Sequence, residues 1–113
     1  MGKMEKNKAI VATLVQEIAQ FGSTPFDDVE NQIILDNERG HYLLYNSGWH
    51  NNRRNYGCYL HLQVKPDGKV SIQHDGTNLK IAEELLKKGI SKEDIVLEFQ
   101  APYKREMTEF AVV

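Results

Sequence analysis

The chain has 113 residues, 41% of them hydrophobic and 27% charged, and carries a net charge of −2. This length and composition predict one soluble domain over residues 1–113, and they exclude a membrane span, which needs about 18 consecutive apolar residues. The charge balance excludes a protein that is basic throughout, although a local basic patch stays open, while the single cysteine excludes an internal disulfide and suits a cytoplasmic location.

The N-terminal part of the chain predicts a helix over Lys3–Phe21. Apolar residues repeat there at the spacing of one helical face, and we expect that face to be buried. Its members are Val11, Leu14, Val15 and Ile18. Gly22 is typical of the residue that follows a helix, and residues 23–28 predict a loop.

Two strands and a turn are predicted next. Val29–Asp36 has an alternating apolar pattern, and Asn37–Gly40 has the composition of a four-residue hairpin turn. His41–Trp49 is apolar on both faces, which predicts a central strand covered on both sides. Residues 50–55, with the sequence HNNRRN, predict a polar loop.

Residues 57–75, GCYLHLQVKPDGKVSIQHD, predict a β-hairpin with a Pro-Asp-Gly turn. The apolar alternation places Val64 opposite Val70 and Leu62 opposite Ile72. Continued without interruption, this register predicts three further pairs. They are Leu60 with His74, His61 with Gln73 and Tyr59 with Asp75.

The two faces of this hairpin are predicted to differ. The apolar face includes Cys58, and we expect that side chain to pack in the core. The polar face carries Tyr59, His61 and Gln73, and it is free to contact another molecule. In the same register His61 and His74 point to opposite faces.

The last third of the chain predicts a helix from Thr77 or Asn78 to Lys88, followed by three short elements. These are a turn opened by a capping box, an extended segment and a final strand: Ser91–Asp94, Ile95–Phe99 and Thr108–Val113. The order of elements predicts an α+β fold. We expect a mostly antiparallel sheet of about five strands, with the N-terminal helix and the second helix packed on one face.

The sequence contains no motif that predicts an enzyme. Four histidines lack the close spacing of metal ligands, and no nucleotide-binding loop or hydrolase elbow occurs. The acidic residues that a metal-dependent nuclease would need lie in predicted turns, where such residues are common. We therefore expect no catalytic residues, no bound metal and no cofactor.

Arginine and aromatic residues gather between the predicted strands, at Trp49, Arg53, Arg54 and Tyr56. Arginine forks match phosphates and carboxylates, and aromatic side chains supply contact area at interfaces. These four residues predict a contact with protein or nucleic acid. A solvated loop whose aromatic residues pack inward is the alternative.

The chain resembles the XisI-like family, the fdxN element excision controlling factor proteins of cyanobacteria. The resemblance runs nearly from end to end and rests on the segments YLLYNSGW, GCYLHLQV, DGKVSIQHDGT and SKEDIVLEF, and on five residues of the tail. They are Pro102, Arg105, Thr108, Phe110 and Ala111. The chain departs from the family pattern at Ser71, Ser91, Glu98 and Gln100, where Trp, Pro, Gly and His are frequent.

The resemblance implies a role in a programmed DNA rearrangement during heterocyst differentiation, in which a site-specific recombinase excises a DNA element. It implies a non-enzymatic accessory factor that binds a XisH-type protein and contacts DNA indirectly or weakly. Free sheet edges also suggest a homodimer. The candidate partner-binding residues are Trp49, Arg53, Arg54, Tyr56, Tyr59, His61, Gln73 and Arg105.

Two alternatives to this accessory role stay open. The first is a recombination directionality factor that binds DNA directly. The second is a small metal-dependent nuclease or hydrolase that uses His61, His74 or Asp75.

Overall fold

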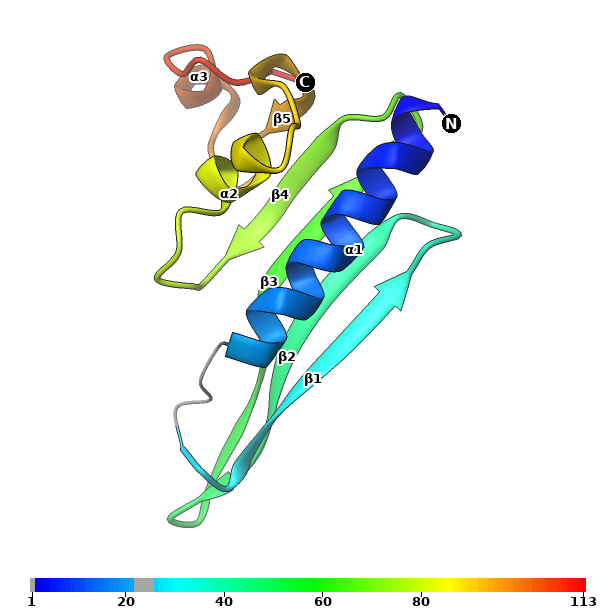
Figure 1. The fold of residues 1–113 in the computed structure, drawn as a ribbon. Helices are drawn as coiled ribbons and strands as arrows, with labels where there is room; N and C mark the ends of the chain where they lie inside the picture. The colour runs from blue at the N-terminus through cyan, green and yellow to red at the C-terminus, as the bar shows by residue number, and fades with distance from the viewer. Residues whose placement is uncertain (1, 22–25) are drawn as a thin grey trace.

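The computed structural model describes residues 2–20 and 26–113 in full, together with the backbone of Phe21. A five-stranded sheet in the order β1-β2-β3-β4-β5 carries the helices α1 and α2 on one face, which confirms the predicted α+β fold (Figure 1). All neighbouring strands are antiparallel except β4 and β5. The elements are α1 (Lys3–Phe21), β1 (Val29–Asp36), β2 (His41–His50), β3 (Arg53–Val64), β4 (Val70–Asp75), α2 (Ile81–Lys87), the 3₁₀ turn η1 (Lys92–Asp94), β5 (Ile95–Val96) and α3 (Pro102–Arg105).

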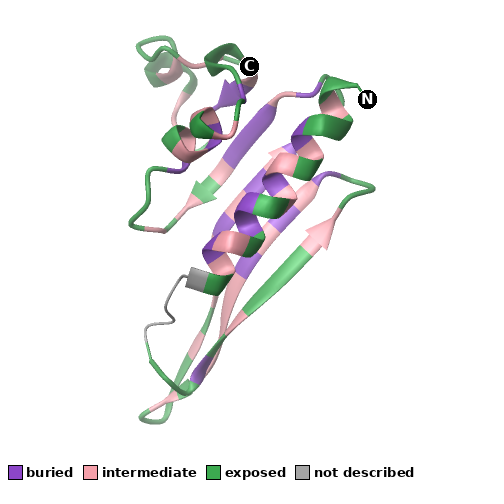
Figure 2. Ribbon diagram, viewed as in Figure 1, coloured by how far each residue is buried: buried purple, intermediate pink, exposed green. Residues whose placement is uncertain are grey.

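The core lies between α1, α2 and the inner face of the sheet. The predicted face of α1 is buried as expected, and it packs on a continuous apolar surface of the strands, which Figure 2 shows in purple. Burying one Val or Leu side chain stabilises a fold by about 1.5–3 kcal/mol, so this layer supplies much of the driving force for folding. The buried residues that β2, β3 and β4 contribute to the core are Tyr42, Leu44, Leu60, Leu62, Val64, Val70 and Ile72. The predictions for residues 22–25 lie outside the described residues.

Strand β2 differs from the prediction because only one of its faces is covered. Tyr42 and Leu44 point toward α1 and are fully buried. Leu43 and Tyr45, on the opposite face, are only partly buried. The apolar residues of this second face therefore do not indicate a second covering layer.

The predicted loop at residues 50–55 is wrong, because both strands continue into it. Strand β2 ends at His50, strand β3 begins at Arg53, and only Asn51 and Asn52 form the turn. Their φ angles of 49° and 63° lie in the left-handed region that both central residues of a type I′ hairpin turn require. Asn is among the few residues that tolerate this region, so the Asn-Asn pair allows the tight turn.

Two β-bulges change the register that the alternation predicts. The pairs of Val64 with Val70 and of Leu62 with Ile72 are confirmed. The register then shifts at Gln73, so that His61 lies opposite His74 and Leu60 opposite Asp75. The three further pairs predicted for Tyr59, Leu60 and His61 are therefore wrong, and His61 and His74 share a face.

A second shift, between β2 and β3, leaves Tyr59 without a cross-strand partner. Its ring packs against the core on the helix side, and its hydroxyl donates a hydrogen bond to Oδ1 of Asn31. Cys58 pairs with Tyr45 instead, on the face away from α1, and remains partly exposed. The sequence pattern placed Tyr59 on the polar face and Cys58 in the core. Both predictions are wrong, because the extra residue of this bulge reverses the faces to which the two side chains point.

The second helix begins later than the cap residues predict. Helix α2 starts at Ile81 without a side-chain cap, while the Thr77 hydroxyl donates to Oδ1 of Asp75 at 2.6 Å. Its predicted end is confirmed, since Gly89 has a φ of 101° just after the helix.

The C-terminal segment is less extended than predicted. Ser91 forms no side-chain cap, and Asp94 accepts a bond from Lys3 at 2.8 Å instead. Strand β5 is two residues long, and the predicted final strand is reduced to a bridge between Val96 and Ala111. The short helix α3, which the sequence pattern did not predict, lies between them in the chain.

Candidate functional site

The face of β2 and β3 that points away from α1 is called here the outer face. Five cross-strand pairs form it: Trp49 with Arg54, Ser47 with Tyr56, Tyr45 with Cys58, Leu43 with His61, and His41 with Gln63. These ten residues include no Asp, Glu or Lys, and Arg54 is the only Arg among them. Interface cores in proteins are likewise depleted of Lys, Glu and Asp and enriched in aromatic residues and Arg.

Arg54 organises an aromatic–arginine cluster at one end of the outer face. Its guanidinium carbon lies 5.8 Å from the centre of the Trp49 ring and 5.2 Å from that of Tyr56. Its Nη2 donates to Oγ of Ser47 at 3.2 Å. Trp49 and Tyr56 are 60% and 66% exposed, so a positioned cation and two aromatic rings face outward.

The outer face adds two residues to this cluster that sequence reasoning missed. The Tyr45 ring lies 5.8 Å from the Tyr56 ring, and Ser47 contacts Arg54. Both share the period-two alternation of Trp49 in β2, and this signal could have found them. The cluster therefore comprises Tyr45, Ser47, Trp49, Arg54 and Tyr56.

Three histidines continue the outer face beyond the cluster. Nδ1 of His41 and Nε2 of His61 are 3.0 Å apart, and His61 lies opposite His74. Burial lowers the pKa of His61, and the positive charges that His41 and His74 can carry lower it further. His61 is therefore a hydrogen-bonded neutral imidazole near neutral pH.

The described residues do not bring the histidines into a metal centre or a catalytic arrangement. Within them, no group of three or more His, Cys, Asp or Glu side chains could hold a metal ion. Asp75 lies opposite Leu60 and accepts hydrogen bonds from the Thr77 amide and hydroxyl, so it is not aligned with His61.

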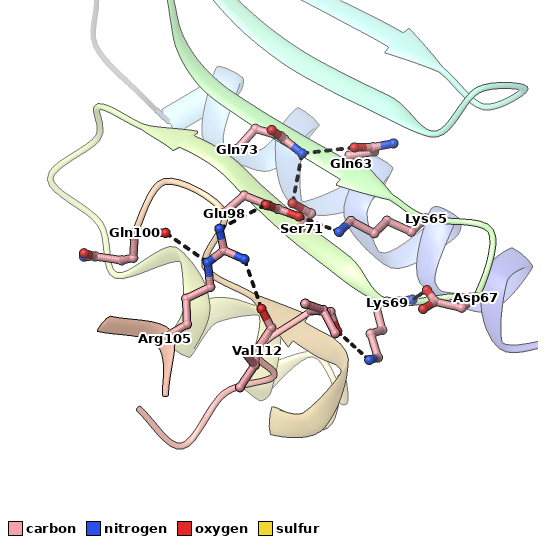
Figure 3. Close-up of polar contacts among 11 residues, drawn as sticks. Gln63, Lys65, Asp67, Lys69, Ser71, Gln73, Glu98, Gln100, Arg105 and Val112 are labelled. Atoms are coloured by element: carbon pink, nitrogen blue, oxygen red, sulfur yellow. Dashed lines mark hydrogen bonds and ion pairs between the residues drawn. The ribbon is translucent and has the colours of Figure 1, made fainter. Parts of the chain in front are cut away.

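Gln73 lies on the outer face of β4, as predicted, but its amide is already bonded. Its Nε2 donates to Oε1 of Gln63 and to Oγ of Ser71, both at 3.0 Å (Figure 3). Gln73 therefore joins the outer face to β4, at some distance along the sheet from the aromatic–arginine cluster.

Arg53 is separated from Arg54 by the pleat of β3. Arg54 pairs with Trp49 on the outer face, whereas Arg53 pairs with His50 on the other face. There it lines a pocket of about 510 Å³ beside Phe26 and His50, whose rings stack 3.7 Å apart. Arg54 lines the same pocket, so the two arginines project from opposite faces of β3 but both reach this pocket.

Arg105 is a structural residue of the C-terminal segment. Its side chain is only 12% exposed, and its Nε and Nη1 donate to the carbonyl oxygens of Gln100 and Val112 at 2.9 and 3.0 Å (Figure 3). Its Nη2 lies 3.5 Å from Oε2 of Glu98. The pKa of Glu98 is lowered, first by a hydrogen bond from Lys65 and also by the charge of Arg105.

The eight candidate residues are thus placed in four different settings. Trp49, Arg54 and Tyr56 form the exposed part of the aromatic–arginine cluster, and His61 and Gln73 lie farther along the same outer surface of the sheet. Tyr59 is on the helix side, Arg53 lines a pocket that Arg54 also reaches, and Arg105 is largely buried in the C-terminal segment.

Known proteins match the chain along its whole length. The family model described as XisI protein matches residues 1–112. A XisI-like protein from Anabaena variabilis superimposes with a TM-score of 0.87 at 42% identity, over 96% of this chain and 97% of that one. The fdxN element excision controlling factor XisI from Anabaena variabilis gives 0.86 at 33% identity, over 99% and 100%. No curated protein sequence matches.

Proposed function

This chain belongs to the XisI family, and on that premise we propose that it is an accessory factor in the controlled excision of a DNA element. It acts through contact with a second protein and performs no catalytic step itself. The name of its relative at 33% identity, fdxN element excision controlling factor, supports this process. No helix among the described residues is long and apolar enough to cross a membrane.

The composition of the outer face carries this proposal. An uncovered sheet surface with nine uncharged residues out of ten resembles an interface core more than an ordinary solvated surface. At its end, Trp49, Arg54 and Tyr56 are the residue types in which binding energy concentrates at protein interfaces. The partner is a XisH-type protein, which docks on the outer face with the aromatic–arginine cluster as its main contact.

The two neighbouring arginines allow a matched test of this surface. Arg54→Ala removes the cation that both rings face, so the affinity for a XisH-type protein should fall at least about 30-fold, or roughly 2 kcal/mol. Arg53→Ala removes the same charge from the opposite face and should leave the affinity within about twofold. Isothermal titration calorimetry measures both, and circular dichroism checks that each variant is folded.

The pair of variants also separates this surface from its alternatives. An equal loss of affinity in Arg53→Ala and Arg54→Ala would indicate a contact through general charge or the hairpin tip. Unchanged binding in both variants would remove the aromatic–arginine cluster from the interface.

Direct DNA binding is the second candidate, and the distribution of charge favours it. From Arg39 to Pro66 the chain has no Asp or Glu, although it has 16 acidic residues in all. The hairpin of β2 and β3 is therefore locally basic within an acidic protein. If it contacts phosphates, the logarithm of the affinity for duplex DNA should fall linearly with the logarithm of the salt concentration, by about 0.9 per contact. Absence of binding at low salt would exclude this candidate.

A further inference from the structure

Strand β1 forms a long free edge of the sheet. It pairs with β2 through all eight of its residues, and no other described segment pairs with its outer side (Figure 1). The opposite edge is different, because β5 has two residues and Ala111 forms a bridge to Val96. A row of unpaired backbone amides and carbonyls along β1 is thus available for another strand.

The sequence of β1, VENQIILD, has little of the usual protection of an edge strand, because its two charged residues, Glu30 and Asp36, lie near its ends. It contains no Pro and no Lys, and its pairing with β2 has no bulge. Ile33 and Ile34, on opposite faces, are 44% and 48% exposed, so both faces of the edge are apolar at the same point. An exposed apolar edge strand of this kind favours association with another strand, because pairing satisfies its backbone groups and covers its apolar side chains.

We propose that β1 pairs with β1 of a second copy of this chain, in an antiparallel twofold dimer that extends the sheet. A twofold axis perpendicular to the sheet keeps the helices of both copies on the same side. Residues that lie opposite each other must then belong to the same face. On β1 the helix face carries Ile33 and Leu35, which lie opposite Leu44 and Tyr42 of β2, and the outer face carries Ile34.

Three registers satisfy this condition near the centre of β1, and one fits best. A twofold axis at Gln32 places Ile34 opposite Glu30 of the second copy. An axis at Ile33 places Glu30 opposite Asp36 of the second copy, which is unfavourable because like charges repel. An axis at Ile34 places Ile34 opposite Ile34 and Ile33 opposite Leu35, so all three apolar residues meet apolar partners.

The surface that this pairing buries is small. The register at Ile34 pairs residues 32–36 of each copy, which is less than the standard interface of about 1,600 Å². The dimer is therefore expected to dissociate on dilution. It does not depend on the proposed function, because β1 contributes no residue to the aromatic–arginine cluster.

Sedimentation velocity over a range of concentrations tests the dimer. Ile34→Lys sets two like charges opposite each other at the axis and should raise the dimer dissociation constant at least about tenfold. Leu79→Lys is the matched control, because Leu79 is 47% exposed and lies outside the sheet, and it should leave the constant unchanged. A monomer at every concentration, or a dimer insensitive to Ile34→Lys, would overturn the proposal.

Disulfide trapping tests the register itself, in a Cys58→Ser background. Residues directly opposite in antiparallel strands have Cβ atoms about 4.5–5.5 Å apart, so Ile34→Cys should form a cross-linked dimer on mild oxidation. Ile33→Cys should cross-link poorly alone and form a dimer when mixed with Leu35→Cys. Equal cross-linking of Ile33→Cys and Ile34→Cys alone would overturn the register.

Discussion

Arg53 and Arg54 illustrate how much one residue position decides in this protein. They are adjacent and chemically identical, yet the pleat of β3 places Arg53 opposite His50 on one face and Arg54 opposite Trp49 on the other, although both line the pocket beside His50. A loop reading of HNNRRN treats them as equivalent. The structure separates them because the turn needs only two residues, Asn51 and Asn52.

His61 should make the stability of the protein depend on pH. Its native pKa lies below the value of about 6.5 for an unfolded histidine, because burial and neighbouring imidazoles disfavour its charge. As the pH falls below 6.5, the unfolded chain takes up a proton that native His61 does not, so native stability decreases toward the lowered pKa. Above 6.5 this effect is absent.

Urea unfolding at pH 7.5 and 5.5 measures this effect. His61→Gln keeps a polar side chain without a titrating group, so it should lose less stability than the wild type between the two pH values. The difference between the two proteins isolates His61 from the other histidines. Equal losses would show that His61 does not contribute.

Ser71 and Glu98 show two departures from the family pattern that meet in space. Ser71 is fully buried, and its hydroxyl hydrogen-bonds the carboxylate of Glu98. The family often has a large residue, Trp, at the first position and a small one, Gly, at the second. A small residue beside a large one keeps the local volume, so the two departures compensate each other here.

At the level of whole elements, the bulges decide which side chains reach the outer face. One extra residue at Tyr59 sends that ring to the core and Cys58 outward, and another at Gln73 brings His61 and His74 together. The alternating pattern predicts the register correctly near the turn, where Val64, Val70 and the next pair are all apolar. The pattern does not predict where a bulge occurs. An extra residue in one strand moves every following side chain to the opposite face, and the order of apolar and polar residues does not show that change.

Arg105 should hold the C-terminal segment to the rest of the fold. Arg105→Ala removes hydrogen bonds to two carbonyl groups and an ion pair at a site that is nearly buried, so it should lower the free energy of unfolding by about 2 kcal/mol. Chemical denaturation measures this change. Hydrogen exchange of the Ala111 amide, which donates to the Ile95 carbonyl, should become faster.

Lys104 provides the control for Arg105. Its side chain is exposed, and Lys104→Ala should change stability by no more than about 0.5 kcal/mol. Equal losses in the two variants would contradict a structural role for Arg105. A loss of partner affinity in Arg105→Ala without any loss of stability would instead return Arg105 to the interface.

The elements differ in how far the sequence predicts them. Helix α1 follows from its strong periodicity, and its bounds agree with the prediction. The structure of the tail does not follow from its sequence pattern. Residues 108–113 alternate like a strand, but only Ala111 forms a β-bridge, with Val96. Whether a strand forms depends on a free neighbouring edge, and β5 offers only two residues.

For the molecule as a whole, α1 and α2 cover one side of the sheet, and the outer face of β2 and β3 on the other side remains open, whereas Ser71 of β4 is buried beside Glu98. The sequence predicted this division, since apolar and polar residues alternate in the hairpin, and it predicted Trp49, Arg54 and Tyr56 as contact residues. It did not predict that Tyr45 and Ser47 would join them, or that Tyr59 would point to the core. In the proposed dimer both outer faces point the same way, because the twofold axis is perpendicular to the sheet. Two aromatic–arginine clusters would then face one partner assembly.

Trp49 is the single tryptophan of the chain, and its indole is mostly in water while the fold is intact. Its intrinsic fluorescence is therefore a poor signal for unfolding, since the ring is hydrated before and after the transition. The same emission reports directly on anything that settles over Arg54, because a docked surface would exclude water from the indole and shift its emission to shorter wavelength. Trp49 is therefore a native fluorescent probe of the aromatic–arginine cluster, and a titration with a binding partner needs no added label.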